Sequence, residues 1–186
     1  MAVIKAPPPD RIEKVFEPYA REVGKLVAAW NQLQERLGEL FSTIVSKDHP
    51  GIALAVWYST QSDRTQREML RGAKEASAAA GLLNERAASD IKWLLDRSEE
   101  LAHQRNDALH APVAFYTDQD GTKLMTEYFF GNPRASNLKD KNLSDEFSWY
   151  EKKATCLSGF ALRCSICLRN ADFPWIERPQ LPNRGE

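Results

Sequence analysis

The segment from Arg105 to His110, which reads Arg-Asn-Asp-Ala-Leu-His, contains the residue types that act on phosphate esters. A guanidinium is permanently charged and binds phosphoryl oxygens through several N–H donors. An imidazole can accept or release a proton near neutral pH. Arg105 and His110 are therefore candidate catalytic residues. Asn106 is a candidate to orient His110 or to bind a phosphate.

The helical phase of Arg105 distinguishes it from an ordinary surface arginine. The neighbouring apolar residues form one stripe at helical spacing, namely Ile91, Leu94, Leu95, Leu101, Ala102 and Leu109. Arg105 falls inside this stripe, where burial of its charge is costly unless the charge is paired or faces a polar cleft. Such a mismatch is typical of a functional site. The structural alternative is an arginine whose stem packs on apolar surface while its head pairs with a carboxylate of another helix.

Two further polar residues, His103 and Glu99, lie on the flank of the same stripe and are candidates for supporting roles. On an ideal helix, Arg105 and His110 are about 140° apart. A single straight helix therefore does not aim both side chains at one phosphate. Fraying of the helix before Pro112, or a second subunit, would relieve this.

The string resembles the R-x4-6-H motif of HEPN domains, here with four intervening residues and with the Asn that commonly follows the Arg. HEPN domains are bundles of four to five helices, and their motif lies near the end of a late helix. The resemblance covers roughly residues 12–170. It implies a homodimeric, metal-independent endoribonuclease with no cofactor, acting in a toxin, defence or RNA-processing system. The second function it implies is a non-catalytic module that binds RNA, nucleotide or a protein partner.

The resemblance also implies a mechanism. His110 would act as base on the ribose 2′-OH or as acid toward the 5′-oxygen, and Arg105 would stabilise the phosphoryl charge. The products would be a 2′,3′-cyclic phosphate and a 5′-hydroxyl. One toxin branch has a tyrosine two residues after the His, whereas Ala111 and Pro112 follow it here. This difference departs from the typical HEPN pattern. So does a β-hairpin, which is predicted to follow the motif.

Three arginines, Arg64, Arg67 and Arg71, share one face of the helix that Asp63 is expected to cap. They are candidate contacts for RNA phosphates, each of which would add a salt-dependent increment of affinity. The favoured alternative is a solvated face whose arginines pair with Glu68 and Glu75.

The remaining reactive and aromatic residues indicate packing. Cys164 and Cys167 form a C-x-x-C string, but only one other cysteine, Cys156, remains, which is too few ligands for a typical zinc site. We therefore expect these cysteines in the core and predict no metal. Trp30 fits the apolar phase of its helix and is expected in the core. Trp93 lies off the apolar stripe of its helix and is expected to pack against another helix or a partner subunit.

The elements that position these residues are those of a mainly helical bundle of four to five helices, with a β-hairpin inserted before the last helix. Expected helices span residues 12–46, 52–58, 63–80, 84–110 and 145–170, with Ser144 or Asp145 as the last N-cap. Pro18 marks a start or bend in the first helix. The hairpin is predicted at about residues 113–130, and residues 131–142 are predicted to be a polar loop.

The chain ends are predicted to lie outside the 12–170 domain. Residues 1–11 are rich in proline and expected to be extended, and residues 171–186 form a proline-rich tail that Trp175 is expected to anchor. A length of 186 residues suits one domain, and the net charge of -1 gives no general argument for a nucleic-acid partner. From the sequence we expect no signal peptide and no membrane span, and the three cysteines favour a cytoplasmic protein.

Overall fold

The computed structural model describes residues 8–118, 121–126, 131–170 and 172–184, and its fold is mainly helical. The elements in chain order are α1 (Pro9–Val45), α2 (Pro50–Tyr58), α3 (Asp63–Ala79), α4 (Glu85–His110), β1 (Val113–Asp118), β2 (Gly121–Thr126), α5 (Pro133–Leu138) and α6 (Leu143–Arg169). The predicted class, a helical bundle with a hairpin before its last helix, is confirmed. A short helix, α5, lies between the hairpin and α6.

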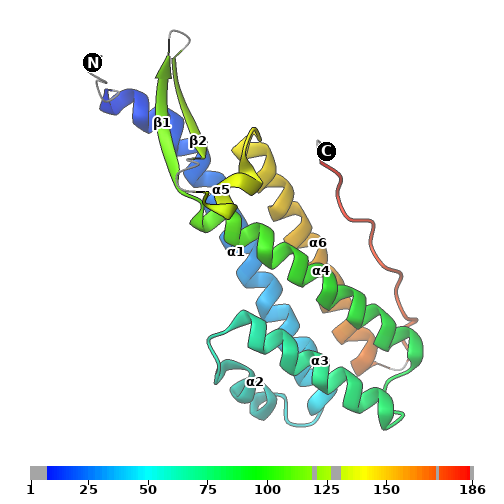
Figure 1. The fold of residues 1–186 in the computed structure, drawn as a ribbon. Coiled ribbons are helices and arrows are strands. Elements are labelled where there is room, and N and C mark those ends of the chain that lie inside the picture. Colours follow the sequence, from blue (N-terminus) through cyan, green and yellow to red (C-terminus); the bar gives the residue numbers. More distant parts are fainter. Residues whose placement is uncertain (1–7, 119–120, 127–130, 171, 185–186) are drawn as a thin grey trace.

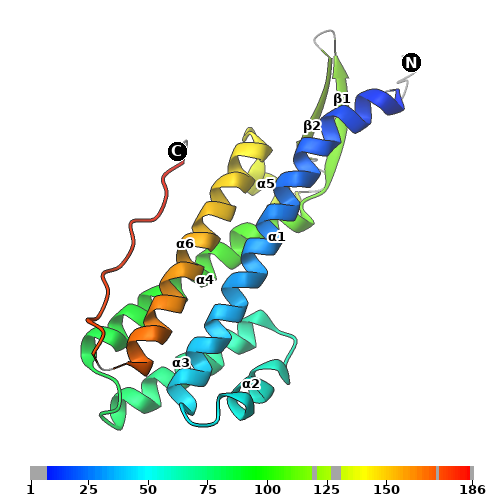
Figure 2. The same cartoon turned by 180° about the vertical axis from the view of Figure 1, so that it is seen from behind.

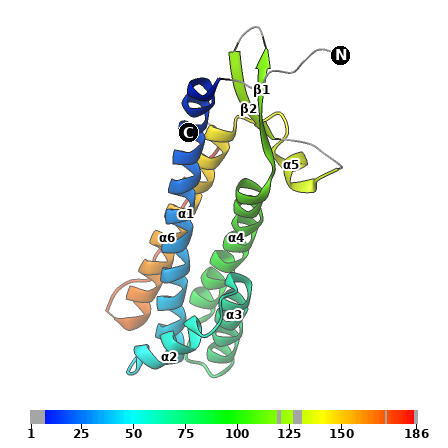
Figure 3. The same ribbon diagram turned by 90° about the vertical axis from the view of Figure 1, so that its left-hand side faces the viewer.

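The bundle consists of four long helices, with α1, α4 and α6 running along its length (Figure 1). Helix α6 packs against both α1 and α4, and α3 packs against α1 and α4 at one end. Helix α2 lies beside α3 at that same end (Figure 2). At the opposite end, the hairpin projects beside the first turns of α1 (Figure 3).

The core is formed by the apolar stripes predicted for the long helices. The fully buried residues include Leu26, Leu33, Leu37, Leu40, Ile91, Leu94, Leu95, Phe147, Leu157 and Phe160. Complete burial of a side chain of this size contributes about 1.5–3 kcal/mol. The core therefore holds α1, α4 and α6 together and fixes which face of α4 is directed toward α1 and α3.

Side-chain oxygens cap the starts of several helices, and two of these caps differ from the predicted ones. Ser62, not Asp63, caps α3, because its Oγ accepts the N–H of Thr65 at 3.3 Å. Asn142, not Ser144 or Asp145, caps α6, because its Oδ1 accepts the N–H groups of both residues, at 3.1 and 3.4 Å. The start near Asn84 is confirmed, with Oδ1 of Asn84 accepting from Ala87 at 2.8 Å.

Prolines begin α1 earlier than the sequence pattern indicated. The helix starts at Pro9, so the prediction of extended chain to residue 11 is wrong for residues 9–11, and residues 1–7 lie outside the described part. Proline suits a first helical position, because its missing N–H has no intrahelical partner there. The helix continues through Pro18, which neither starts nor ends it. Tyr19, next to it, packs against Phe147 of α6 with ring centroids 5.6 Å apart.

The predicted loop at residues 131–142 contains α5 instead. Asn132 caps this helix by accepting from Arg134 and Ala135, and two residues of the helix, Ala135 and Leu138, are buried. The hairpin is antiparallel, with Phe115 opposite Leu124. Residues 119–120 of the predicted turn and 127–130 of the predicted second strand lie outside the described part of the chain.

The C-terminal segment runs along α4 and α6 and is attached by side chains (Figure 1). As expected, Trp175 anchors it, because its indole N–H donates to Asp90 of α4 at 2.7 Å. Farther along, the indole N–H of Trp149 donates to the carbonyl of Pro182 at 2.8 Å. Of the helices within the described ranges, none has both the length and the apolar character needed to cross a membrane.

Candidate functional site

Arg105 lies on the face of α4 that is directed toward α1 and α3, as its helical phase predicted. Its Nη2 donates to Asp63 Oδ2 at 3.1 Å, and its Nη1 donates to Asn106 Oδ1 at 2.7 Å. The guanidinium also lies 5.0 Å from the ring centroid of Trp30, within the range of a cation–π contact. Arg105 thus has the carboxylate partner that the structural alternative predicted. The pair is not sealed, because the side chains of Arg105 and Asp63 are 20% and 34% exposed.

Trp30 of α1 forms the inner wall of this site. It is almost fully buried, and its indole N–H donates to the same oxygen of Asp63, at 3.0 Å, that Arg105 uses. A second guanidinium, that of Arg67 on α3, lies 5.8 Å from the same ring. We call Trp30, Asp63, Arg67 and Arg105 the tryptophan cluster. It joins three helices through one aromatic ring and one carboxylate.

Arg67 is the most deeply buried charge of the tryptophan cluster, with only 5% of the residue exposed. Its Nη1 is buried and has no hydrogen-bond partner among the described residues. Burial lowers the pKa of Arg67 below its ordinary value, and the charges of Asp63 and Glu99 act in the opposite direction. An arginine still stays protonated near neutral pH. The cluster therefore holds a poorly compensated positive charge.

His110 is the last residue of α4 and is exposed to solvent. Asn106 turns its oxygen toward Arg105, so it positions the arginine. Within the described residues, no hydrogen bond joins His110 or His103 to Arg105. The structure thus brings Arg105 and Asn106 together, whereas the two histidines stand apart on exposed positions of the same helix.

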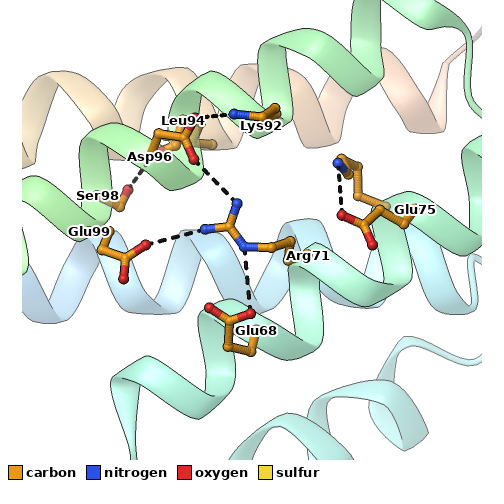
Figure 4. Close-up of polar contacts among 9 residues, drawn as sticks. Glu68, Arg71, Glu75, Lys92, Leu94, Asp96, Ser98 and Glu99 are labelled. Carbon is orange, nitrogen blue, oxygen red and sulfur yellow. Dashed lines mark hydrogen bonds and ion pairs between the residues drawn. The ribbon is translucent and has the colours of Figure 1, made fainter.

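The three arginines predicted to share one face of α3 have three different environments. Arg64 is exposed and Arg67 is buried. Arg71 is surrounded by carboxylates, with Glu68 at 3.6 Å, Asp96 at 3.2 Å and Glu99 at 3.3 Å (Figure 4). The ion-paired alternative thus describes Arg71. Glu99, a candidate supporting residue for Arg105, is a partner of Arg71 instead.

Cys164 lies in the core and Trp93 packs against it, whereas Cys167 is only half-buried and its thiol donates to the carbonyl of Pro174 at 3.4 Å. The predicted core position is therefore confirmed for Cys164 and wrong for Cys167. Cys164 is fully buried, and burial, reinforced by the charge of Asp90, raises the pKa of its thiol to about 12. Trp93 packs edge-on against Phe160 of α6, with ring centroids 5.5 Å apart. Among the residues that the structure describes, no three His, Cys, Asp or Glu side chains gather as a possible metal site.

Two members of the tryptophan cluster were not singled out from the sequence. Asp63 was interpreted as a helix cap and Trp30 as a core residue, and each interpretation used only its own helix. Asp63 is 42 residues from Arg105 in the chain. Together with Trp30, the contact links three helices. The only local signal was an acidic residue in the first turn of α3, which is common for helix-dipole reasons alone.

Comparison of the chain with known protein families, with curated proteins and with solved structures gives no match. The functional assignment therefore depends on the residues and geometry described above.

Proposed function

We propose that this protein is a metal-independent endoribonuclease of the HEPN type, in which Arg105, Asn106 and His110 act together. The observation that carries the proposal is the setting of Arg105. A permanently charged guanidinium interrupts the apolar face of α4, is held by Asn106 and Trp30, and keeps one fifth of its side chain exposed. It lies five residues from an exposed histidine at the end of the same helix.

Each residue has a distinct part in the proposed reaction. The imidazole of His110 takes the proton of the ribose 2′-OH or gives a proton to the departing 5′-oxygen. The guanidinium of Arg105 stabilises the charge that develops on the phosphoryl oxygens. Asn106 holds that guanidinium through the 2.7 Å contact with its Nη1. Cleavage yields a 2′,3′-cyclic phosphate and a 5′-hydroxyl.

A homodimer is part of the proposal, because one helix does not direct Arg105 and His110 to the same point. The two positions are about 140° apart around an ideal helix and about 7.5 Å apart along it. A second copy that approaches the end of α4 would bring its own pair to the same RNA strand. The exposure of His110 at that helix end leaves room for such an approach.

The test is cleavage of end-labelled RNA in EDTA by the wild type and by His110→Ala and Arg105→Ala. We expect the rate to fall by at least about 100-fold in each variant. His49→Ala and Arg97→Ala are matched controls, because His49 is an exposed turn residue and Arg97 pairs with Glu100 elsewhere on α4. Cleavage that survives in His110→Ala, or that disappears equally in the controls, contradicts the proposed site.

One observation favours a second function, a non-catalytic module that binds RNA. Two donors of Arg105 are already occupied by Asp63 and Asn106, and no hydrogen bond joins His110 to that group within the described residues. Binding of the same end-labelled RNA, measured beside its cleavage, distinguishes the two functions. Retention of RNA by a verified dimer, without cleavage and with loss on Arg105→Ala, identifies the binding module.

A further inference from the structure

The charges of the tryptophan cluster do not balance at hydrogen-bond distance. Two guanidiniums, of Arg67 and Arg105, lie against one indole ring, and Asp63 is the single carboxylate that either of them contacts within the described residues. Two of their N–H groups, on Nη1 of Arg67 and Nε of Arg105, are buried without a hydrogen-bond partner in the part of the chain that the structure describes. A buried charge without a partner is costly. The cluster is thus better suited to two negative charges than to one.

Asp63 lies where an incoming anion would reach this positive charge. It is the most exposed of the three charged members, at 34% for its side chain, and it is the first residue of α3. The N-terminus of a helix carries a partial positive charge that favours anions. The side of the cluster that solvent reaches therefore combines a helix N-terminus, the guanidinium of Arg105 and the carboxylate that pairs with this guanidinium.

We propose that the tryptophan cluster is a phosphate-binding site, in which the carboxylate of Asp63 occupies the position on Arg105 that a phosphodiester group takes when RNA binds. The proposal rests on the function proposed above and adds a regulatory residue to the same site. Asp63 acts as an internal competitor. A phosphate binds to Nη2 of Arg105 only by displacing the Asp63 carboxylate from that atom. Arg67, whose guanidinium lies 5.8 Å from the ring centroid of Trp30, adds to the local positive potential.

The surroundings of Asp63 allow such an exchange. The N-terminus of α3 is capped by Ser62 through its own bond to Thr65, so the helix start does not depend on the Asp63 carboxylate. Arg105 keeps its contacts with Asn106 and Trp30 when its Nη2 changes partner. A phosphodiester, like a carboxylate, carries one negative charge and can accept from Nη2 of Arg105 in its place. Asp63 still accepts from the indole N–H of Trp30, so the phosphate supplies the second negative charge of the cluster.

The experiment measures binding of a fluorescent 2′-O-methyl RNA, which lacks the attacking hydroxyl and is therefore not cleaved. The variant is Asp63→Asn, which keeps an oxygen to accept from Trp30 but removes the competing charge. Asp96→Asn is the matched control, because it makes the same charge change beside Arg71. We expect Asp63→Asn to tighten binding about five-fold, the value of one solvent-screened ion pair, and Asp96→Asn to change it by less than about two-fold.

The double variant Asp63→Asn with Arg105→Met completes the test and should lose the whole gain. Equal effects of Asp63→Asn and Asp96→Asn, or a gain that persists without Arg105, would overturn the proposal. The cleavage assay separates this failure from failure of the ribonuclease proposal. Cleavage that depends on His110 with no tightening by Asp63→Asn removes only the competitor role. Tightening without any cleavage retains the phosphate site and removes catalysis.

Discussion

Arg67 and Arg71 are one turn apart on α3, yet their surroundings are opposite. Arg71 is partly exposed and has three carboxylates within 3.6 Å. Arg67 is buried against Trp30 with no carboxylate at that distance among the described residues, and a second guanidinium, that of Arg105, lies over the same ring. The Arg71 network carries surplus negative charge, whereas the tryptophan cluster carries surplus positive charge.

This difference separates an arginine that serves the fold from arginines suited to a ligand. A network such as that of Arg71 joins α3 to α4 and repels a phosphate. A buried guanidinium without a carboxylate does not help folding, because its desolvation is not repaid. Such a residue is typical of sites where local stability is lower in exchange for function. The comparison therefore favours the surroundings of Trp30 as the candidate anion site and argues against an anion site at Arg71.

The largest expected effect comes from removing the shared ring. Trp30→Ala should destabilise the protein by about 3–5 kcal/mol, because a buried tryptophan is lost and both guanidiniums lose their cover. Trp30→Phe is the control that keeps a ring but removes the bond to Asp63. Urea denaturation followed by circular dichroism measures both. A cost for Trp30→Ala no greater than that for Arg71→Met would contradict the central position of this ring.

The comparison is sharpest in a matched pair of arginine substitutions. Arg67→Met should be neutral or stabilise by about 1 kcal/mol, because an unpaired buried charge becomes apolar. Arg71→Met should destabilise by about 1 kcal/mol, because three neighbouring carboxylates lose their shared cation. The free energies of unfolding of the two variants are the measurement. If both substitutions destabilise the protein, or both stabilise it, the proposed difference between an unpaired and an ion-paired arginine is wrong.

The smallest expected effect is a dependence on pH in the Arg71 network. Burial raises the pKa of Asp96, but hydrogen bonds from Lys92 and Arg71 outweigh it and leave the pKa below its ordinary value. A carboxyl whose folded pKa is depressed contributes stability above its unfolded pKa of about 3.9 and loses that contribution as pH falls through the folded value.

The stability difference between wild type and Asp96→Asn should therefore be complete at neutral pH and shrink below pH of about 4. Its size should stay under about 1 kcal/mol, because the pair is partly exposed and screened by solvent. Asp48→Asn, in the exposed turn before α2, is the control for the loss of a surface carboxylate. A difference that grows on acidification would exclude the depressed pKa.

Local patterns were sufficient to predict most of the helices. The spacing of apolar residues determines which face of α4 enters the core, and Pro112 and Gly81 limit α4 and α3 because both act on their own backbone. Predictions failed where a side chain from just outside a helix caps it, as at Ser62 and Asn142. They also failed at α5, which is too short for a periodic pattern to be recognised.

The candidate site divides in the same way. The sequence by itself determined that Arg105 is out of place on an apolar face, since that statement needs only the 3.6-residue period of one helix. Only the tertiary structure decided that Asp63 and Trp30 complete its surroundings, because these residues come from helices whose relative register depends on how the whole core packs. It likewise decided that Arg67 is buried and Arg71 is paired, although one turn of the same helix separates them.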